Sequence, residues 1–170
     1  TQGGPARPPL VLRPATTGTV VFALQDAAQP ATVAASHVEL RDITIHGREL
    51  ATPGTCLRVA GNIEDLSRAR TRIDHCRVCL DAGTTSLTHF TLEDSSMSDI
   101  QERAIDCGRA TCSHHRLNRV VFEHLGYDTA STTTKILYSA SSRDSRWRDV
   151  TVRDSIGDGV RFDGPAPSIA

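Results

Sequence analysis

One short apolar signature recurs along this chain and constrains its fold more than any other feature. The signature places two further core-type residues three and five positions after a first one. It begins at Leu40, with Ile43 and Ile45, and recurs in segments that begin with Leu66, Leu87, Leu117 and Trp147. A repeat of roughly 20 to 30 residues is typical of stacked supersecondary units.

A second pattern, in step with the first, alternates apolar and polar residues. It occurs at Leu57/Val59, Val78/Leu80, Ile105/Cys107, Ile136/Tyr138 and Val160/Phe162. Two short strands per period, joined by turn residues, predict strands rather than helices. We therefore expect an all-β chain that forms a parallel β-helix of about five to six coils. We expect the helix to be right-handed, because parallel crossovers are usually right-handed. Residues 1–170 would form one such domain, either complete or as a segment of a longer chain or assembly.

Composition agrees with a thin solenoid and excludes two classes of partner. Aromatic residues make up only 4% of the 170 residues, as expected for a core of small aliphatic columns. The formal net charge is −1 and the only lysine is Lys135, so the chain lacks the basic balance of a nucleic-acid-binding domain. No apolar run is long enough to span a membrane.

The sequence contains five cysteines, which is an odd number. Cys76 and Cys79 form a CxxC, but no second pair of ligands follows at zinc spacing, so no metal site is predicted there. The localisation that we expect is extracellular, or on a cell or virion surface. In that setting one disulfide can form, and Cys107–Cys112 is one candidate, but the sequence leaves the connectivity open.

The outward positions beside the second pattern supply the catalytic candidates. If Val59, Leu80, Ile105, Tyr138 and Phe162 form one inward column, the next outward column is Ala60, Asp81, Asp106, Ser139 and Asp163. Coils about 4.8 Å apart would bring Asp81 and Asp106 side by side. Such a pair can share a cation such as Ca²⁺, share a proton, or flank a sugar bond. The alternative is a row of surface ion pairs with Arg58, Arg103 and Arg161.

A third catalytic candidate is Lys135, which follows a long excursion at residues 126–134. A lysine of lowered pKa could abstract a sugar proton, although an ordinary solvated charge is the alternative. Tyr127, Arg161 and Asp163 are the candidates for positioning an acidic sugar. The charged residues Asp42, Arg68, His89, Arg119 and Asp149 are expected to form one solvent-facing column of mixed sign.

Two segments resemble a known group of proteins. Residues 4–22 with 37–47, and 136–164 with its Trp147-Arg-Asp-Val-Thr-Val-Arg-Asp motif, resemble carbohydrate-active β-helix proteins of the pectin-lyase-like superfamily. They are most similar to the alginate lyase and chondroitinase B family. The chain departs from that family at its catalytic positions. Ala140 or Ser141 stands where the lysine is expected, and Phe162 and Asp163 replace an arginine–histidine pair.

These features leave two functions open. One is a polysaccharide lyase or glycoside hydrolase that acts on acidic glycans through Asp81 and Asp106. The other is a non-catalytic structural or adhesive β-helix that binds glycan or other chains. Homo-oligomers could form by stacking of open coil ends.

Overall fold

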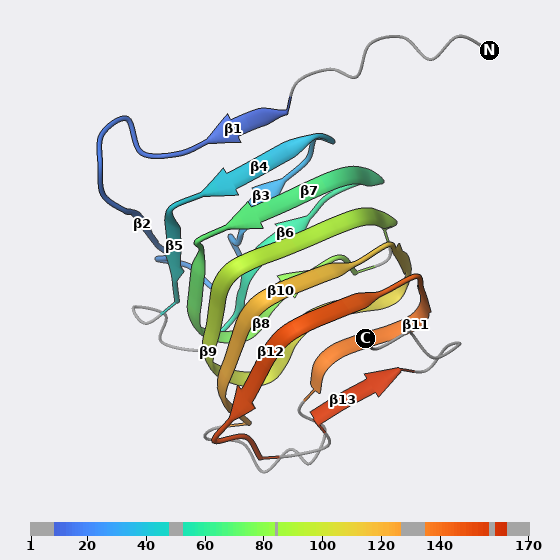
Figure 1. The fold of residues 1–170 in the computed structure, drawn as a ribbon. Helices are drawn as coiled ribbons and strands as arrows, with labels where there is room; N and C mark the ends of the chain where they lie inside the picture. The colour runs from blue at the N-terminus through green and yellow to red at the C-terminus, as the bar shows by residue number, and fades with distance from the viewer. Residues whose placement is uncertain (1–8, 48–52, 84, 127–134, 157–158, 163–170) are drawn as a thin grey trace, which may run out of the picture.

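The computed structural model of the protein describes residues 9–47, 53–83, 85–126, 135–156 and 159–162, with the backbone alone at 109–111, 135, 137–143 and 159–162. These residues form a parallel β-solenoid, as predicted (Figure 1). Every strand pair in them is parallel. They contain no helix, and so none long and apolar enough to cross a membrane.

The strands stack into three faces. Face 1 contains β1 (Leu10–Leu12), β4 (Val38–Arg41), β7 (Ile63–Ala69) and the first parts of β9 (Leu87–Ser113), β10 (Arg116–Leu125) and β12 (Arg146–Arg153). Face 2 contains β2 (Val20–Ala23), β5 (Ile43–His46), the first part of β8 (Arg72–Asp81) and the next parts of β9, β10 and β12. Face 3 contains β3 (Ala31–Val33), β6 (Thr55–Val59), the ends of β8 and β9, β11 (Lys135–Arg143) and β13 (Gly159–Phe162).

The solenoid makes about four turns, slightly fewer than the five to six coils expected from the repeat. The first winding consists of short strands, and the apolar residues of β1 and β2 are exposed to solvent. Leu10 is 59% exposed and Val21 is 60% exposed. The buried core begins with Leu24 and Val33 at the end of the first winding and includes Leu66, Phe90 and Phe122 further along the chain.

Single residues with left-handed backbone conformation produce the bends of each coil. Fourteen residues other than glycine have φ between 46° and 58°, and they recur at three equivalent places. The first bend contains His37, Asp65, His89, His114 and Asp144; the second contains Asp42, Arg70, Asp94, Arg119 and Asp149; the third contains His75, Asp99, His124 and Asp154. Figure 1 shows β9, β10 and β12 turning from one face to the next.

The apolar signature is the second bend with its flanking core residues. Leu40, Leu117 and Trp147 each precede a bend residue by two positions, as the signature predicts. In the two coils between, the register places Arg68 and Leu92 beside Leu40 and Leu117, not the predicted Leu66 and Leu87. The prediction was wrong there because Arg68 stands at the leucine position of one coil, and Ser95 stands at the position of Val120 in the next.

Candidate functional site

The two predicted aspartates are neighbours on face 3. Asp81 of β8 and Asp106 of β9 are direct partners in the register, as expected. Asp81 is half-buried and Asp106 is 8% exposed. Their inward neighbours differ from the prediction, because Leu57, not Val59, pairs with Leu80.

Two predicted column members also differ from the observed register. Arg58 takes the place beside Asp81 that had been expected for Ala60. Tyr138 is in register with Asp106 and not with the inward Ile105. The column prediction was wrong at these places because alternation within a strand does not fix which residues of the neighbouring strand stand opposite it.

Each aspartate is held by its own arginine. Arg58 Nε lies 3.5 Å from Asp81 Oδ2. Arg103 Nη1 donates to Asp106 Oδ2, and the backbone N–H of Gly108 donates to Asp106 Oδ1 at 2.8 Å. Gly108 has a φ of +47°, and a Cβ there would lie 2.6 Å from the carbonyl oxygen of Gly83. These contacts are ion pairs with arginines, the alternative that the sequence left open beside a functional carboxylate pair.

For the other predicted site residues the structure describes no side chain. Lys135 begins β11 in register with Arg103, and Arg161 in β13 is in register with Tyr138; only their backbones are described. Tyr127 and Asp163 lie outside the described residues, as does the excursion from 127 to 134.

The outer side of face 1 carries a different group of polar residues. One outward column runs across successive strands through Glu39, Ser67, Thr91, Arg116 and Arg146. Arg116 and Arg146 are exposed and are direct partners in the register. Among the described residues, no carboxylate lies within 4.0 Å of either guanidinium.

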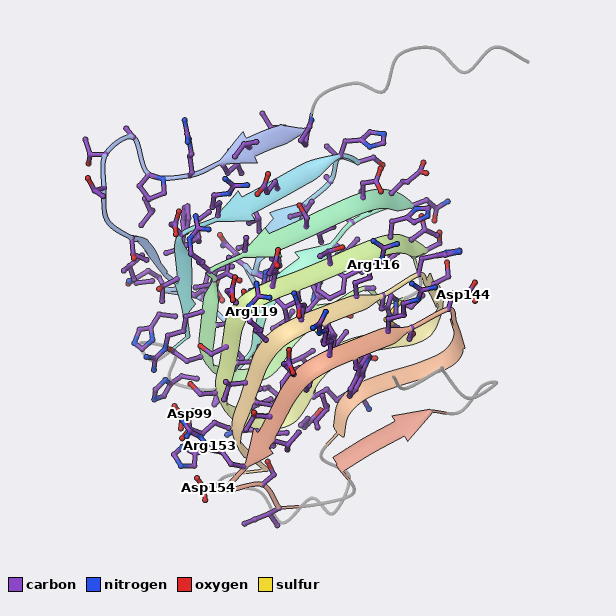
Figure 2. The ribbon with its side chains drawn as sticks, viewed as in Figure 1. Asp99, Arg116, Arg119, Asp144, Arg153 and Asp154 are labelled. Atoms are coloured by element: carbon purple, nitrogen blue, oxygen red, sulfur yellow. A yellow bond between two sulfur atoms is a disulfide. The ribbon has the colours of Figure 1, made fainter. Side chains whose placement is uncertain are left out.

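Several other arginines of the described surface are, by contrast, paired with carboxylates. Arg119, at the second bend, donates from Nε to Asp94 Oδ1 at 2.5 Å and from Nη2 to Glu93 at 2.8 Å. Those hydrogen bonds raise the pKa of Arg119 and lower the pKa of Asp94. Arg153 donates to Glu123 at 3.0 Å. Figure 2 shows Arg119 and Arg153 away from Arg116.

The imidazole rings of the first bend lie beside the two unpaired arginines. The rings of His89 and His114 are stacked, with centroids 4.7 Å apart and planes at 28°. Two adjoining hollows of about 420 and 280 Å³ share these rings and Arg116. The larger also contains the hydroxyls of Ser67 and Thr91, and the smaller contains Arg146.

Two carboxylates also line these hollows, Asp65 the larger and Asp144 the smaller. Asp144 Oδ2 lies 3.3 Å from His114 Nε2, and Asp65 Oδ1 lies 3.7 Å from His89 Nδ1. Both pair with histidines of the first bend rather than with Arg116 or Arg146. We call Ser67, Thr91, Arg116 and Arg146, with His89 and His114, the face 1 surface.

Sequence reasoning missed this surface although a signal was present. Arg116 and Arg146 directly precede Leu117 and Trp147, the first residues of two correctly aligned signatures. The neighbour of an inward residue points outward, so both arginines could have been placed in one column. The predicted column of charges was also wrong in part. Arg68 is buried and His89 belongs to the first bend, whereas Asp42, Arg119 and Asp149 do share the second bend.

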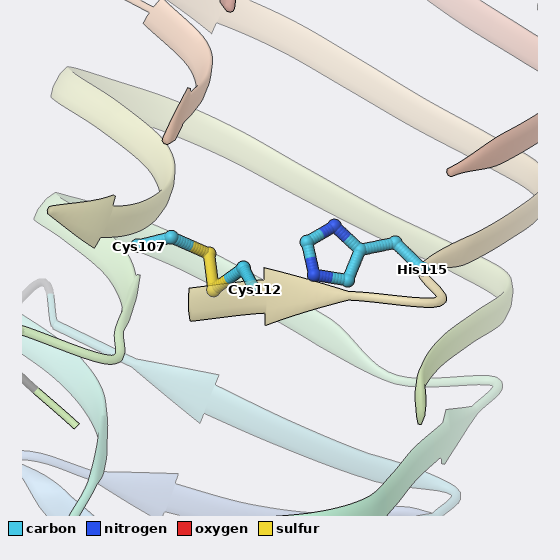
Figure 3. Close-up of side chains that lie close together, drawn as sticks. All are labelled: Cys107, Cys112 and His115. Atoms are coloured by element: carbon cyan, nitrogen blue, oxygen red, sulfur yellow. A yellow bond between two sulfur atoms is a disulfide. The ribbon is translucent and has the colours of Figure 1, made fainter. Parts of the chain in front are cut away.

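The cysteines form two disulfides. The predicted Cys107–Cys112 bond is confirmed, and Cys56–Cys76 is a second one that the sequence did not indicate. Cys79 is buried and free, and burial raises the pKa of its thiol. His115 lies beside the Cys107–Cys112 bond, and burial lowers its pKa to about 4 (Figure 3).

No protein family matches this sequence, and no curated protein or solved structure is significantly similar to it. The likeness to the alginate lyase and chondroitinase B family therefore stays a prediction.

Proposed function

We propose that this β-solenoid binds acidic polysaccharide through the face 1 surface and does not cleave it. The observation that carries the proposal is the pair Arg116 and Arg146, which stand in register on β10 and β12 without a carboxylate partner among the described residues. Guanidinium groups match the planar fork of a carboxylate, the charged group of uronic acids.

The neighbouring groups fit a sugar chain rather than an isolated anion. Ser67 and Thr91 present hydroxyls in the same outward column as the two arginines, and His89 and His114 border it. Hydroxyl and imidazole groups can donate hydrogen bonds to sugar hydroxyls and can also accept hydrogen bonds from them. The column crosses the strands, so an extended chain lying along the solenoid axis would meet one side chain per coil.

A net charge of −1 favours a short anionic segment over a nucleic acid, whose binding domains are basic overall. The two disulfides support an oxidising compartment, and hence an extracellular, cell-surface or virion-surface location.

Cleavage is the second candidate function. The register neighbours Asp81 and Asp106 favour it, since adjacent carboxylates can serve as acid and base. The arginine contacts of both groups weigh against it, because a general acid must hold a proton and an adjacent cation favours the ionised form.

The test is retention on immobilised polygalacturonate, alginate and neutral dextran. We expect wild type to be retained by the acidic polymers only. The double variant Arg116→Gln/Arg146→Gln should elute early, because each charged hydrogen bond contributes about 1.5–3 kcal/mol. The matched control is Arg119→Gln/Arg153→Gln, which removes two paired arginines and the same charge.

Equal loss of retention in the control would show that net charge alone governs binding and would overturn the proposal. Release of new reducing ends or unsaturated products by wild type, abolished in Asp106→Asn, would replace binding with catalysis.

A further inference from the structure

The third bend gathers histidines and carboxylates that the proposed function does not use. Along this edge, His75, Asp99, His124 and Asp154 follow one another on successive coils, next to Asp74 and His46. Figure 2 shows Asp99 and Asp154 together on this edge, away from Arg116.

Three of these side chains converge on one point. His46 Nδ1 contacts Asp74 Oδ1, and His75 Nδ1 lies 3.1 Å from the same oxygen. One ligand atom of each residue lies within 4.8 Å of the other two. The two imidazole rings meet edge to face, with centroids 5.2 Å apart.

The surroundings fix the carboxylate and leave the imidazoles accessible. The side chain of Asp74 is only 4% exposed, and Arg72 Nε donates to its other oxygen, Oδ2, at 2.6 Å. This hydrogen bond orients Oδ1 toward the histidines, as the outer-shell partners of metal ligands do. The side chains of His46 and His75 are 23% and 31% exposed, so both rings are in contact with solvent.

We propose that His46, Asp74 and His75 form a binding site for a zinc ion, with water as a further ligand. Two imidazoles and one carboxylate are a donor set that zinc accepts, at about 2.0–2.2 Å per ligand. Calcium and magnesium prefer oxygen ligands throughout, which this trio does not supply. The site goes beyond the proposed glycan binding and does not depend on it.

Two other groups of ligand-type side chains in the described residues are weaker candidates. Glu123, His124 and Asp154 share the same edge but are more exposed, with His124 at 50%. Cys107 and Cys112 stand beside His115, but their sulfurs are joined to each other.

The experiment is calorimetric titration of ZnCl₂ into the chelator-treated, disulfide-intact protein. We expect one zinc ion per chain. His46→Gln and His75→Asn should each weaken binding at least tenfold. Asparagine is chosen at position 75 because it tolerates the φ of 56° there. The matched control is His124→Asn, which has a φ of 52° and lies on the same edge, and it should bind zinc like wild type.

A second measurement guards against a variant that fails to fold. In wild type, zinc should shift the NMR signals of the His46 and His75 imidazoles before those of the other five histidines. The proposal is overturned if wild type binds no zinc saturably, if both site variants bind it normally, or if His124→Asn loses it.

Discussion

Arg68 shows how a single residue can conflict with the core that surrounds it. Its side chain is 1% exposed and lies in the inward column between Leu40 and Leu92. Nη2 donates to Thr71 Oγ1 at 2.9 Å, but Nε and Nη1 have no hydrogen-bond partner in the described residues. Burial lowers its pKa to about 10, so the group is still charged at neutral pH.

Replacing this arginine should stabilise the protein. We expect Arg68→Met to raise the free energy of unfolding by about 1–4 kcal/mol, because an apolar side chain removes the desolvation cost of a buried charge. Urea denaturation monitored by circular dichroism measures the change. Arg70→Met, which removes an exposed arginine paired with Asp42, is the control and should not stabilise. A less stable Arg68→Met would contradict a net cost of burying this charge.

His115 makes stability depend on pH in a defined window. Its folded pKa is about 4, chiefly because of burial, against an ordinary value of 6.5. Between these values the unfolded chain binds a proton that the folded chain does not, so stability falls as pH drops from about 6.5 to about 4. The loss is on the order of 3 kcal/mol.

The variant His115→Phe keeps an aromatic ring against Phe90 and cannot titrate. Its stability relative to wild type should therefore improve between pH 7 and pH 4.5, as measured by chemical denaturation at both values. The other six histidines are common to both proteins and cancel in the comparison. A constant difference between the two proteins would contradict a buried neutral imidazole.

At the scale of the element, the bends decide where each strand turns. All fourteen left-handed residues are Asp, His or Arg, and oppositely charged members stand on adjacent coils at the second bend. Arg70 donates to Asp42 at 2.6 and 2.7 Å, and the Arg70 contact lowers the pKa of Asp42. Short polar residues such as Asp tolerate left-handed backbone, and long arginines between them supply the opposite charge.

Asp149 tests the backbone requirement separately from the charge. We expect Asp149→Val to destabilise the protein by about 1–2 kcal/mol, because a β-branched residue strains at its φ of 51°. Asp149→Asn and Asp149→Gly should be nearly neutral. Thr151→Val, an exposed position two residues further along β12, is the control. Thermal melting compares all four, and equal effects of valine at both positions would contradict the assignment of the bend.

At the scale of the whole molecule, the sequence predicted the architecture better than the site. Period and alternation were enough for a parallel solenoid, because each coil repeats the same packing. They misplaced two coils, since Arg68 interrupts the leucine column in one and Ser95 stands at the position of Val120 in the other. Asp81 and Asp106 were correctly brought together, but their arginine contacts depend on side-chain geometry.

Arg116 and Arg146 could have been placed in one column from the sequence, but not recognised as unpaired. That property depends on where every nearby carboxylate goes. Asp144 lies close in sequence to Arg146 yet contacts His114. Only the three-dimensional arrangement separates these two arginines from paired ones such as Arg119.

The central claim is that two unpaired guanidinium groups on face 1 bind a uronate chain. Titration calorimetry with a defined oligogalacturonate, under identical salt conditions, tests it most directly. We predict saturable binding by wild type and by Arg119→Gln/Arg153→Gln, and at least tenfold weaker binding by Arg116→Gln/Arg146→Gln. Binding of equal strength by all three proteins would place the ligand elsewhere and contradict the claim.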